Sequence, residues 1–145
     1  MEAIDNDCIF CQVVVGQKSA AIVFEDEISL AFLDHRPLFP GHCLLVPKKH
    51  FETLIDLPGG LIGPFFSNVQ LLARAVESGL DAEGSFVAMN NRISQSVPHF
   101  NVHVVPRRKK DGLKGFFWPR NKYSSELEIT EVQKRITTAI RAIKQ

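Results

Sequence analysis

The feature that most constrains this chain is a long apolar stripe at helical spacing, which lies between two groups of short apolar runs. Apolar residues recur every three or four positions from Leu61 to Val76, which predicts a helix that begins at Gly59-Gly60 and ends at Gly79. The short runs predict about five strands, and the run at 42–47 is expected at the centre because its inner residues are almost all apolar. The expected strands cover 22–24, 29–33, 42–47, 86–89 and 99–105.

A second apolar stripe near the C-terminus predicts another helix. Its members are Val132, Ile136, Ile140 and Ile143. Thr130 and Gln133 fit a capping box at the start of this helix. Hairpin-length connections between the strands favour an α+β fold, in which a five-stranded antiparallel sheet carries one long helix and a C-terminal helix. The 145 residues are expected to form one domain, 1–145, with its core at about 8–107 and an aromatic segment and helix at 113–144.

Composition excludes several classes of partner. Lys and Arg number 17 against 16 Asp and Glu, so the net charge of +1 gives no general attraction to nucleic acid or to an anionic membrane. No run approaches the roughly 20 apolar residues of a membrane span, and the first residues do not resemble a signal peptide. Three cysteines are an odd number and too few for a disulfide framework. We therefore expect no nucleic-acid or membrane partner and a cytoplasmic location, or a nuclear one in a eukaryote.

The stretch from His99 to Val105 is the most informative for function. Alternation along a strand places His99, Asn101 and His103 on one face. The intervening residues Phe100, Val102 and Val104 then point into the core. By alternation alone, the two histidines could equally be solvent-facing side chains of an edge strand.

Several segments, taken in order, resemble the histidine triad (HIT) superfamily of nucleotide hydrolases and transferases. The strand matches the family motif His-φ-His-φ-His-φ-φ, where φ is apolar, except at its middle position. The other matching segments are Cys8-Ile9-Phe10-Cys11, Phe24-Glu25-Asp26-Glu27, Ala31-Phe32-Leu33-Asp34, Pro40-Gly41-His42, Val46-Pro47-Lys48-Lys49-His50 and Gln95-Ser96-Val97. The resemblance covers roughly residues 8 to 107, and its nearest branch is that of the histidine triad nucleotide-binding proteins with a Cys-x-x-Cys near the start.

The middle position of the triad is Asn101 rather than histidine. In the family this histidine attacks the α-phosphate and becomes transiently nucleotidylated. The lone pair of a carboxamide nitrogen is delocalised into the carbonyl, so Asn101 is not a nucleophile. We therefore expect the site to bind nucleotide without forming the covalent intermediate. A natural loss of catalysis and a deliberate His→Asn substitution both explain the residue, and the intact remainder of the triad, His99 and His103, favours the second.

The Cys8-x-x-Cys11 pair is a candidate half of a zinc site. A structural zinc site needs four ligands, and the chain has no second Cys-x-x-Cys, so histidines should complete it. The candidates are His50 and His99, which the resemblance supports, because Cys-x-x-Cys members of the family complete a structural zinc site with the equivalent histidines. Thioredoxin-like redox chemistry and plain buried thiols remain alternatives. Cys43 lies within an apolar strand and is expected to be a core residue.

The resemblance also implies a nucleotide pocket that binds AMP or another adenylyl compound. Asp34 would accept hydrogen bonds from the ribose hydroxyls, and His103 would contact the α-phosphate. The purine slot would be formed by Ile9, Phe10, Val13, Phe32 and Leu33, which without the resemblance would be assigned to the core. Donors to the phosphate would be Asn90, Gln95 and Ser96. The family is usually a homodimer, so a homodimer is expected here.

With histidine at position 101, the expected reaction is hydrolysis or transfer of a nucleotidyl group through a nucleotidyl-histidine. In this reaction His99 would orient its neighbours or hold the metal, and His103 would stabilise charge on the phosphoryl oxygens. Phosphoramidates, dinucleoside polyphosphates and adenylyl sulfate are all candidate substrates. Two further hypotheses are a nucleotide sensor that is natively non-catalytic, and a zinc-stabilised interaction module that binds no nucleotide.

Overall fold

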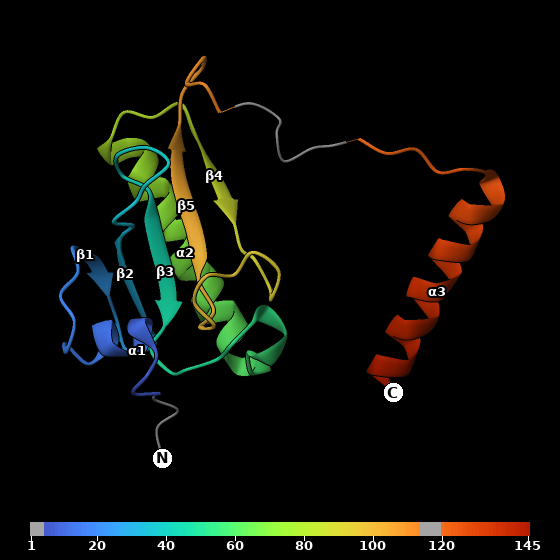
Figure 1. Ribbon diagram of the computed structural model, residues 1–145, viewed down its shortest axis with the longest axis horizontal. Coiled ribbons are helices and arrows are strands. Elements are labelled where there is room, and N and C mark those ends of the chain that lie inside the picture. Colours follow the sequence, from blue (N-terminus) through green and yellow to red (C-terminus); the bar gives the residue numbers. More distant parts are fainter. Residues whose placement is uncertain (1–4, 114–119) are drawn as a thin grey trace. The chain divides into compact units, whose positions relative to one another are not determined.

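The computed structural model describes residues 5–113 and 120–145 (Figure 1). The chain divides into two compact units, residues 1–111 and 112–145. The predicted aromatic segment at 116–119 lies outside the described residues. Among the residues that are described, no helix is both long enough and apolar enough to cross a membrane.

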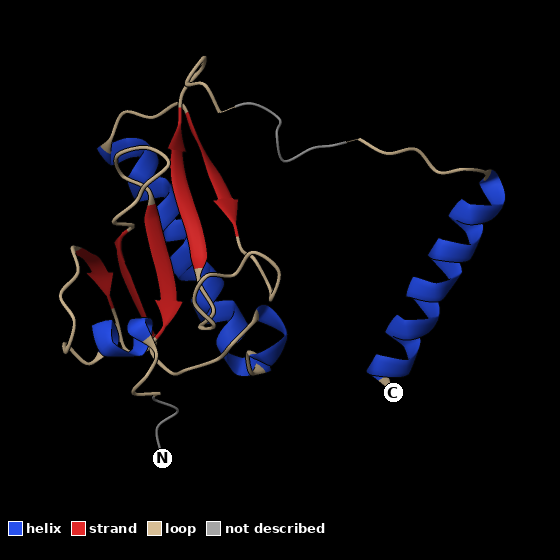
Figure 2. Ribbon diagram, in the orientation of Figure 1, coloured by secondary structure: helices blue, strands red, loops and turns tan. Residues whose placement is uncertain are grey.

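The first unit is built on a five-stranded sheet in the order β1-β2-β3-β5-β4, in which every neighbouring pair is antiparallel (Figure 2). Its strands are β1 (Ile22–Glu25), β2 (Ser29–Leu33), β3 (Cys43–Pro47), β4 (Gly84–Ala88) and β5 (Val102–Arg107). Its helices are α1 (Ile9–Val14), the short 3-10 helix η1 (Leu54–Asp56) and α2 (Gly59–Gly79). The long helix has the predicted limits, and β3 is the central strand as predicted.

The sheet separates two apolar clusters, and β3 contributes alternate side chains to each. Cys43 and Leu45 join the cluster beneath α2, whereas Leu44 and Val46 join the cluster on the α1 side. The stripe on α2 is buried at Phe65, Val69, Leu72 and Val76. A strand that is buried on both faces reads as a continuous apolar run, which is why this one could be recognised from the sequence.

The strand β5 begins three residues later than predicted. The backbone N–H of Phe100 donates to Phe51 O at 2.7 Å, outside the ladder, so regular pairing with β3 starts at Val102. The burial pattern still alternates as expected, with Phe100, Val102 and Val104 in the α2 cluster. Pro106 lies inside the strand rather than after it. Beyond Val104 the strand is paired only with β4, so this segment has a free side that tolerates proline.

The second unit contains α3 (Glu126–Lys144). The capping box predicted at Thr130 is wrong, because the helix begins four residues before that position. The Ser125 side chain is the cap instead and accepts a hydrogen bond from the Glu128 N–H at 3.1 Å. Thr130 lies in the first turns, where its hydroxyl donates to Glu126 O at 3.1 Å.

Candidate functional site

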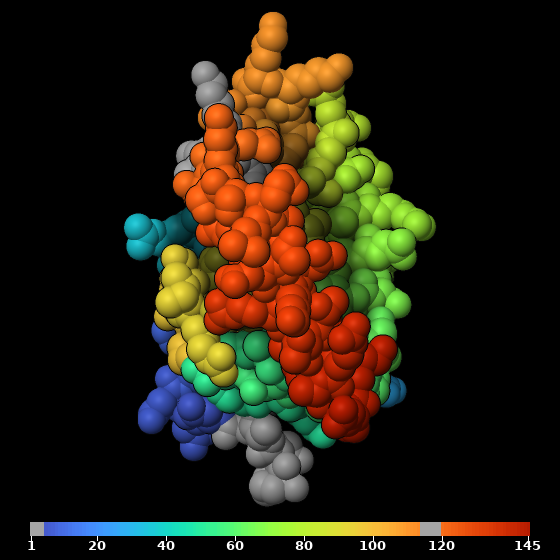
Figure 3. Space-filling view, turned by 90° about the vertical axis from the view of Figure 1, so that its right-hand side faces the viewer, coloured from blue at the N-terminus to red at the C-terminus, as the bar shows by residue number. Residues whose placement is uncertain are grey.

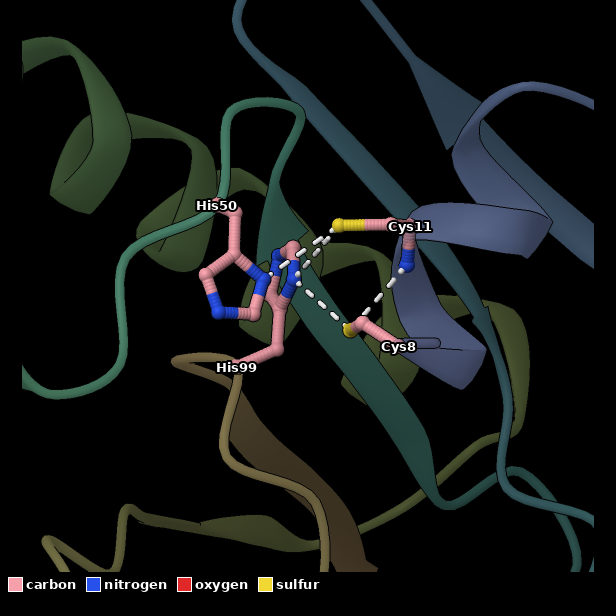
Figure 4. Close-up of side chains that lie close together, drawn as sticks. All are labelled: Cys8, Cys11, His50 and His99. Atoms are coloured by element: carbon pink, nitrogen blue, oxygen red, sulfur yellow. Dashed lines mark hydrogen bonds between the residues drawn. The ribbon is translucent and has the colours of Figure 1, made fainter. Parts of the chain in front are cut away.

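The four predicted metal ligands lie together at the end of the sheet beside α1 (Figure 4). Cys8 caps α1 and Cys11 lies in its first turn, while His50 follows β3 and His99 precedes β5. One potential ligand atom from each of the four residues lies within 4.8 Å of the others. Three of the four residues are buried, and His50 is partly exposed. Segments far apart in the sequence therefore converge on one Cys2His2 cluster.

The histidine at the centre of this cluster is oriented for ligation. The His99 ring donates its Nε2–H to Pro47 O at 2.8 Å, which leaves the Nδ1 lone pair directed at the sulfurs. His99 Nδ1 lies 3.4 Å from Cys8 Sγ and 3.5 Å from Cys11 Sγ, and Cys11 Sγ lies 3.3 Å from His50 Nδ1. A histidine whose second nitrogen donates to a backbone carbonyl is the usual arrangement at a metal.

The electrostatics of the cluster follow from its burial. Burial lowers the pKa of His99 to about 4, so the ring is neutral at physiological pH, as a metal ligand must be. Burial also raises the pKa of Cys11 to about 11, so the thiol stays protonated unless a nearby cation stabilises the thiolate. The donor set of two sulfurs and two imidazole nitrogens suits zinc.

A second group of polar side chains brings Asp34 and His103 together with His42. The Leu38 N–H donates to His42 Nδ1 at 3.0 Å, so the neutral ring carries its proton on Nε2. That Nε2–H faces His103 Nδ1 at 2.9 Å, so the neutral His103 ring must carry its own proton on Nε2. Burial lowers the pKa of both histidines, which favours these neutral forms. The chain of hydrogen bonds thus turns His103 Nε2–H into a fixed donor.

This second group does not suit a metal ion, although its ligand types would allow one. Because His42 Nδ1 accepts the Leu38 N–H, its Nε2 has no lone pair to offer. Asp34 Oδ2 lies 3.6 Å from that nitrogen, and its Oδ1 accepts the Arg36 N–H at 2.9 Å. His42 was not among the predicted site residues, although the Pro40-Gly41-His42 match pointed to this position.

Asn101 lies between the two groups and is 9% exposed. Its Nδ2–H donates to His99 O at 3.0 Å, and since a carbonyl accepts only from a donor, this contact fixes the orientation of the amide. A histidine at the same position could make an equivalent bond through Nδ1–H. Asn101 therefore keeps the hydrogen bond of an imidazole but has no atom that reaches the position of the imidazole Nε2, because its carbonyl oxygen takes the place of the ring Cδ2.

The predicted phosphate donors lie in and beside the loop between β4 and β5, coloured yellow in Figure 3. The Gln95 amide is engaged with the protein, since its Oε1 accepts from Arg92 N at 2.8 Å and its Nε2 donates to Glu52 O at 2.7 Å. Asn91 Oδ1 accepts from Leu54 N at 2.8 Å. Two amides therefore tie the loop to residues 52–54, whereas the predicted residues Asn90 and Ser96 are exposed.

The predicted purine slot divides into buried and exposed residues. Phe10, Val13 and Phe32 are buried in the α1-side cluster, where the Phe10 and Phe32 ring centroids are 5.4 Å apart. Ile9 is 46% exposed and Leu33 is 39% exposed. The structure therefore places three of these residues in the core and leaves Ile9 for contact with a ligand. Leu33 pairs with Cys43, whose side chain joins the α2 cluster, so Leu33 lies on the opposite face of the sheet and does not belong to the slot. Phe10 also packs against the His99 ring at 5.9 Å, which links the slot to the cysteine–histidine cluster.

Comparison with known proteins gives a consistent picture. A family model described as "HIT domain" matches residues 15–110 of the chain. The chain is 31% identical to "Adenylylsulfatase HINT3" of Arabidopsis thaliana over 76% of its length and 57% of that protein. It is 30% identical to an asymmetrical bis(5'-nucleosyl)-tetraphosphatase of Schizosaccharomyces pombe over 84% of its length and 64% of that protein. The chain thus spans about six tenths of both relatives.

Solved structures match over most of the chain. SMU.412c from Streptococcus mutans has a TM-score of 0.86 at 29% identity, covering 97% of this chain and 89% of that one. A Zn-bound histidine triad family protein from Mycobacterium smegmatis has a TM-score of 0.70 at 34% identity, covering 93% of this chain and 96% of that one. The five-stranded antiparallel α+β fold predicted from the sequence is confirmed.

Proposed function

This chain belongs to the HIT domain family, and we propose that it binds an adenylyl-containing nucleotide where Asp34, Asn101 and His103 lie. The family includes hydrolases that act on such compounds, as the names of the Arabidopsis and yeast relatives indicate. The observation that carries the proposal is the hydrogen-bond chain from Leu38 through His42 to His103. It holds a neutral N–H donor ready for a phosphoryl oxygen without a cationic side chain.

The proposed site recognises its ligand through groups of different kinds. His103 Nε2–H donates to an oxygen of the α-phosphate, and Asp34 accepts from the ribose hydroxyls. Ile9, the exposed residue of the predicted slot on this face of the sheet, contacts the base. AMP itself, a phosphoramidate, a dinucleoside polyphosphate and adenylyl sulfate all carry these features, so the four compounds are the ligands to test.

Asn101 lets the site bind without reacting. A histidine there would form an N–P bond from Nε2 while the bond from phosphorus to the leaving group breaks, and water would then release AMP and free histidine. The Asn101 carbonyl oxygen offers no comparable nucleophile. In this proposal the chain keeps the binding groups of a nucleotidyl hydrolase and lacks its covalent step.

The substitution Asn101→His tests this proposal directly. We expect the variant to release AMP from at least one adenylyl compound, several orders of magnitude faster than the unchanged chain. Asn101→Gln, which also lacks an imidazole, is the matched control and should stay inactive. If calorimetry shows AMP binding but Asn101→His stays inactive on all three adenylyl substrates, the chain is a nucleotide sensor. No AMP binding at millimolar concentration would leave only an interaction module.

We further propose that Cys8, Cys11, His50 and His99 hold a structural zinc ion. The ligand types, the convergence of the four side chains and the Nδ1 lone pair of His99 all fit this metal. When bound, the ion would supply cross-linking rather than catalysis, and it would join α1 to the segments that flank β3 and β5. Metal analysis of the purified protein should give one zinc per chain, and Cys11→Ser should lower both the zinc content and the melting temperature. Zinc-free protein of unchanged melting temperature would favour plain thiols.

A further inference from the structure

The loop that joins β4 to β5 has a backbone conformation that its residues do not favour. Arg92 has a φ of 72° and Ser94 has a φ of 60°, so two residues with side chains lie in the left-handed region within three positions. This region is unfavourable for residues other than glycine, because Cβ comes too close to the following carbonyl oxygen. Residues strained in this way persist only where the surrounding structure holds them, and they are frequent at functional sites. The loop is therefore held in place by other contacts.

Gln95 holds this loop with both ends of its amide. Its Oε1 accepts a hydrogen bond from the Arg92 N–H at 2.8 Å, which stabilises the strained turn directly. Its Nε2–H donates to Glu52 O at 2.7 Å, which ties the same turn to a segment that is distant in the sequence. Because the amide oxygen and the amide nitrogen are both engaged, Gln95 cannot turn toward a ligand without releasing the loop.

The segment around η1 that receives these contacts is itself rigid. Thr53 is fully buried, and its N–H and hydroxyl both donate to Asp56 Oδ2, at 3.0 and 2.7 Å. In the same turn, the Leu54 N–H donates to Asn91 Oδ1 at 2.8 Å. Two amide side chains thus tie the loop to one fixed turn, and the position of the loop relative to the sheet depends on them.

Ser96 is the side chain that this arrangement leaves for a ligand. It is exposed, and its hydroxyl takes part in none of the hydrogen bonds among the described residues. Gln95 before it faces Glu52, and Val97 after it packs against the α1-side cluster. The His99 N–H donates to Val97 O at 2.8 Å, so a tight turn joins this part of the loop to the start of the triad. The Ser96 hydroxyl therefore lies between two anchored neighbours.

We propose that Gln95 is a positioning residue, which holds the loop so that the Ser96 hydroxyl donates to the α-phosphate of the nucleotide. The inference rests on the proposed nucleotide site and replaces the expectation that Gln95 itself donates to the phosphate. A hydroxyl that is already held in place loses little conformational freedom when a ligand binds. The hydrogen bonds of Gln95 thus contribute to affinity without contact with the ligand.

A double-mutant cycle in AMP binding, measured by calorimetry, tests this role. Gln95→Met keeps the length of the side chain and removes both hydrogen bonds, whereas Ser96→Ala removes only the hydroxyl. We expect each single variant to bind AMP about three- to tenfold more weakly than the unchanged chain. In the double variant the two losses should not multiply, because without the hydroxyl the position of the loop no longer affects binding.

Three measurements separate positioning from a general loss of structure. Adenosine, which lacks the phosphate, should bind Gln95→Met within about twofold of the unchanged chain in an NMR titration. In the unliganded protein, Gln95→Met should speed hydrogen exchange of the Arg92 N–H and leave that of Val104 in β5 unchanged. Gln70→Met makes the same substitution at an exposed position of α2 and should leave AMP affinity unchanged. Because both Gln95 hydrogen bonds are at the surface, water can replace them and the variant should fold.

The outcomes distinguish this proposal from the proposed nucleotide site. Losses that multiply in the double variant would overturn the positioning role, because Gln95 would then contact the phosphate independently of Ser96. Undiminished AMP affinity of Gln95→Met would overturn it too, as would an equal loss of adenosine affinity. An unchanged chain that binds no AMP would instead overturn the nucleotide site, and the role of Gln95 with it.

Discussion

Replacing His42 by alanine removes the middle of the hydrogen-bond chain that fixes His103. In the folded protein His42 is 4% exposed, and its Nε2 lies 2.9 Å from His103 Nδ1. Without this donor, the His103 ring can rotate or shift its proton to Nδ1, and the donor directed at the ligand is lost. A buried hydrogen bond of this kind contributes about 1–2 kcal/mol, which corresponds to roughly 5–30-fold weaker binding of AMP.

Calorimetry at pH 7.5 measures this effect, and two further variants make it specific. His42→Gln places an N–H donor near the position of the histidine Nε2–H, so we expect it to recover most of the lost affinity. His35→Ala removes an exposed histidine that also lies near Asp34, at 4.0 Å, and should leave AMP binding within about twofold of the unchanged chain.

A folded His42→Ala protein that binds AMP as tightly as the unchanged chain would refute this role of His42. AMP binding by His42→Gln as weak as that by His42→Ala would refute it too, because a cavity rather than a missing donor would then explain the loss. Thermal unfolding of each variant separates these outcomes from a general loss of structure.

Three further outcomes are expected. Burial raises the pKa of Asp26, but hydrogen bonds from Ile28, Asn68 and Ser29 outweigh this effect and hold the pKa below its usual value. The ionised Asp26 carboxylate therefore stabilises the fold fully at neutral pH, and this stabilisation is lost as the pH falls through the lowered pKa. Asp26→Asn, whose amide would face the Asn68 amide, should cost about 1–3 kcal/mol of unfolding free energy in urea at pH 7 and much less at pH 3. Ser125→Ala should reduce α3 helicity in far-ultraviolet circular dichroism, with a loss of about 1 kcal/mol. A strong zinc chelator should lower the melting temperature of the unchanged protein but not that of Cys11→Ser.

The elements predicted correctly are those whose signals are local. The limits of α2 coincide with Gly59 and Gly79, because glycine favours helix ends and its effect involves only residues close to it in the sequence. The start of β5 could not be predicted, because it depends on the bond from Phe100 N to Phe51 O, between residues 49 positions apart. The predicted position of the α3 cap is wrong because Ser125 and Thr130 both fit a capping pattern, and only the structure shows that the helix begins after Ser125.

The candidate site likewise combines residues with a local sequence signal and residues whose roles depend on distant contacts. Cys8 and Cys11 are recognisable by their spacing, and the HIT resemblance supplied His50 and His99. The Pro40-Gly41-His42 match marks the position of His42, but the role of this histidine could not be predicted, because its partner His103 lies 61 positions away. The engagement of Gln95 with Glu52 was equally invisible, because it joins two loops that no sequence spacing relates.

The segment from His99 to Asn101 connects the two halves of the site. The ring of His99 belongs to the cysteine–histidine cluster, while its backbone carbonyl holds the Asn101 amide. Pro47 O accepts a hydrogen bond from the other nitrogen of the His99 ring, so the position of the His99 backbone carbonyl depends on β3 as well as on the cluster. A change in the cluster would therefore move the residue at the proposed nucleophile position without touching the ligand. Because a shift of about 1 Å can cost an oriented reaction a hundredfold in rate, a structural metal here would influence any activity regained by Asn101→His.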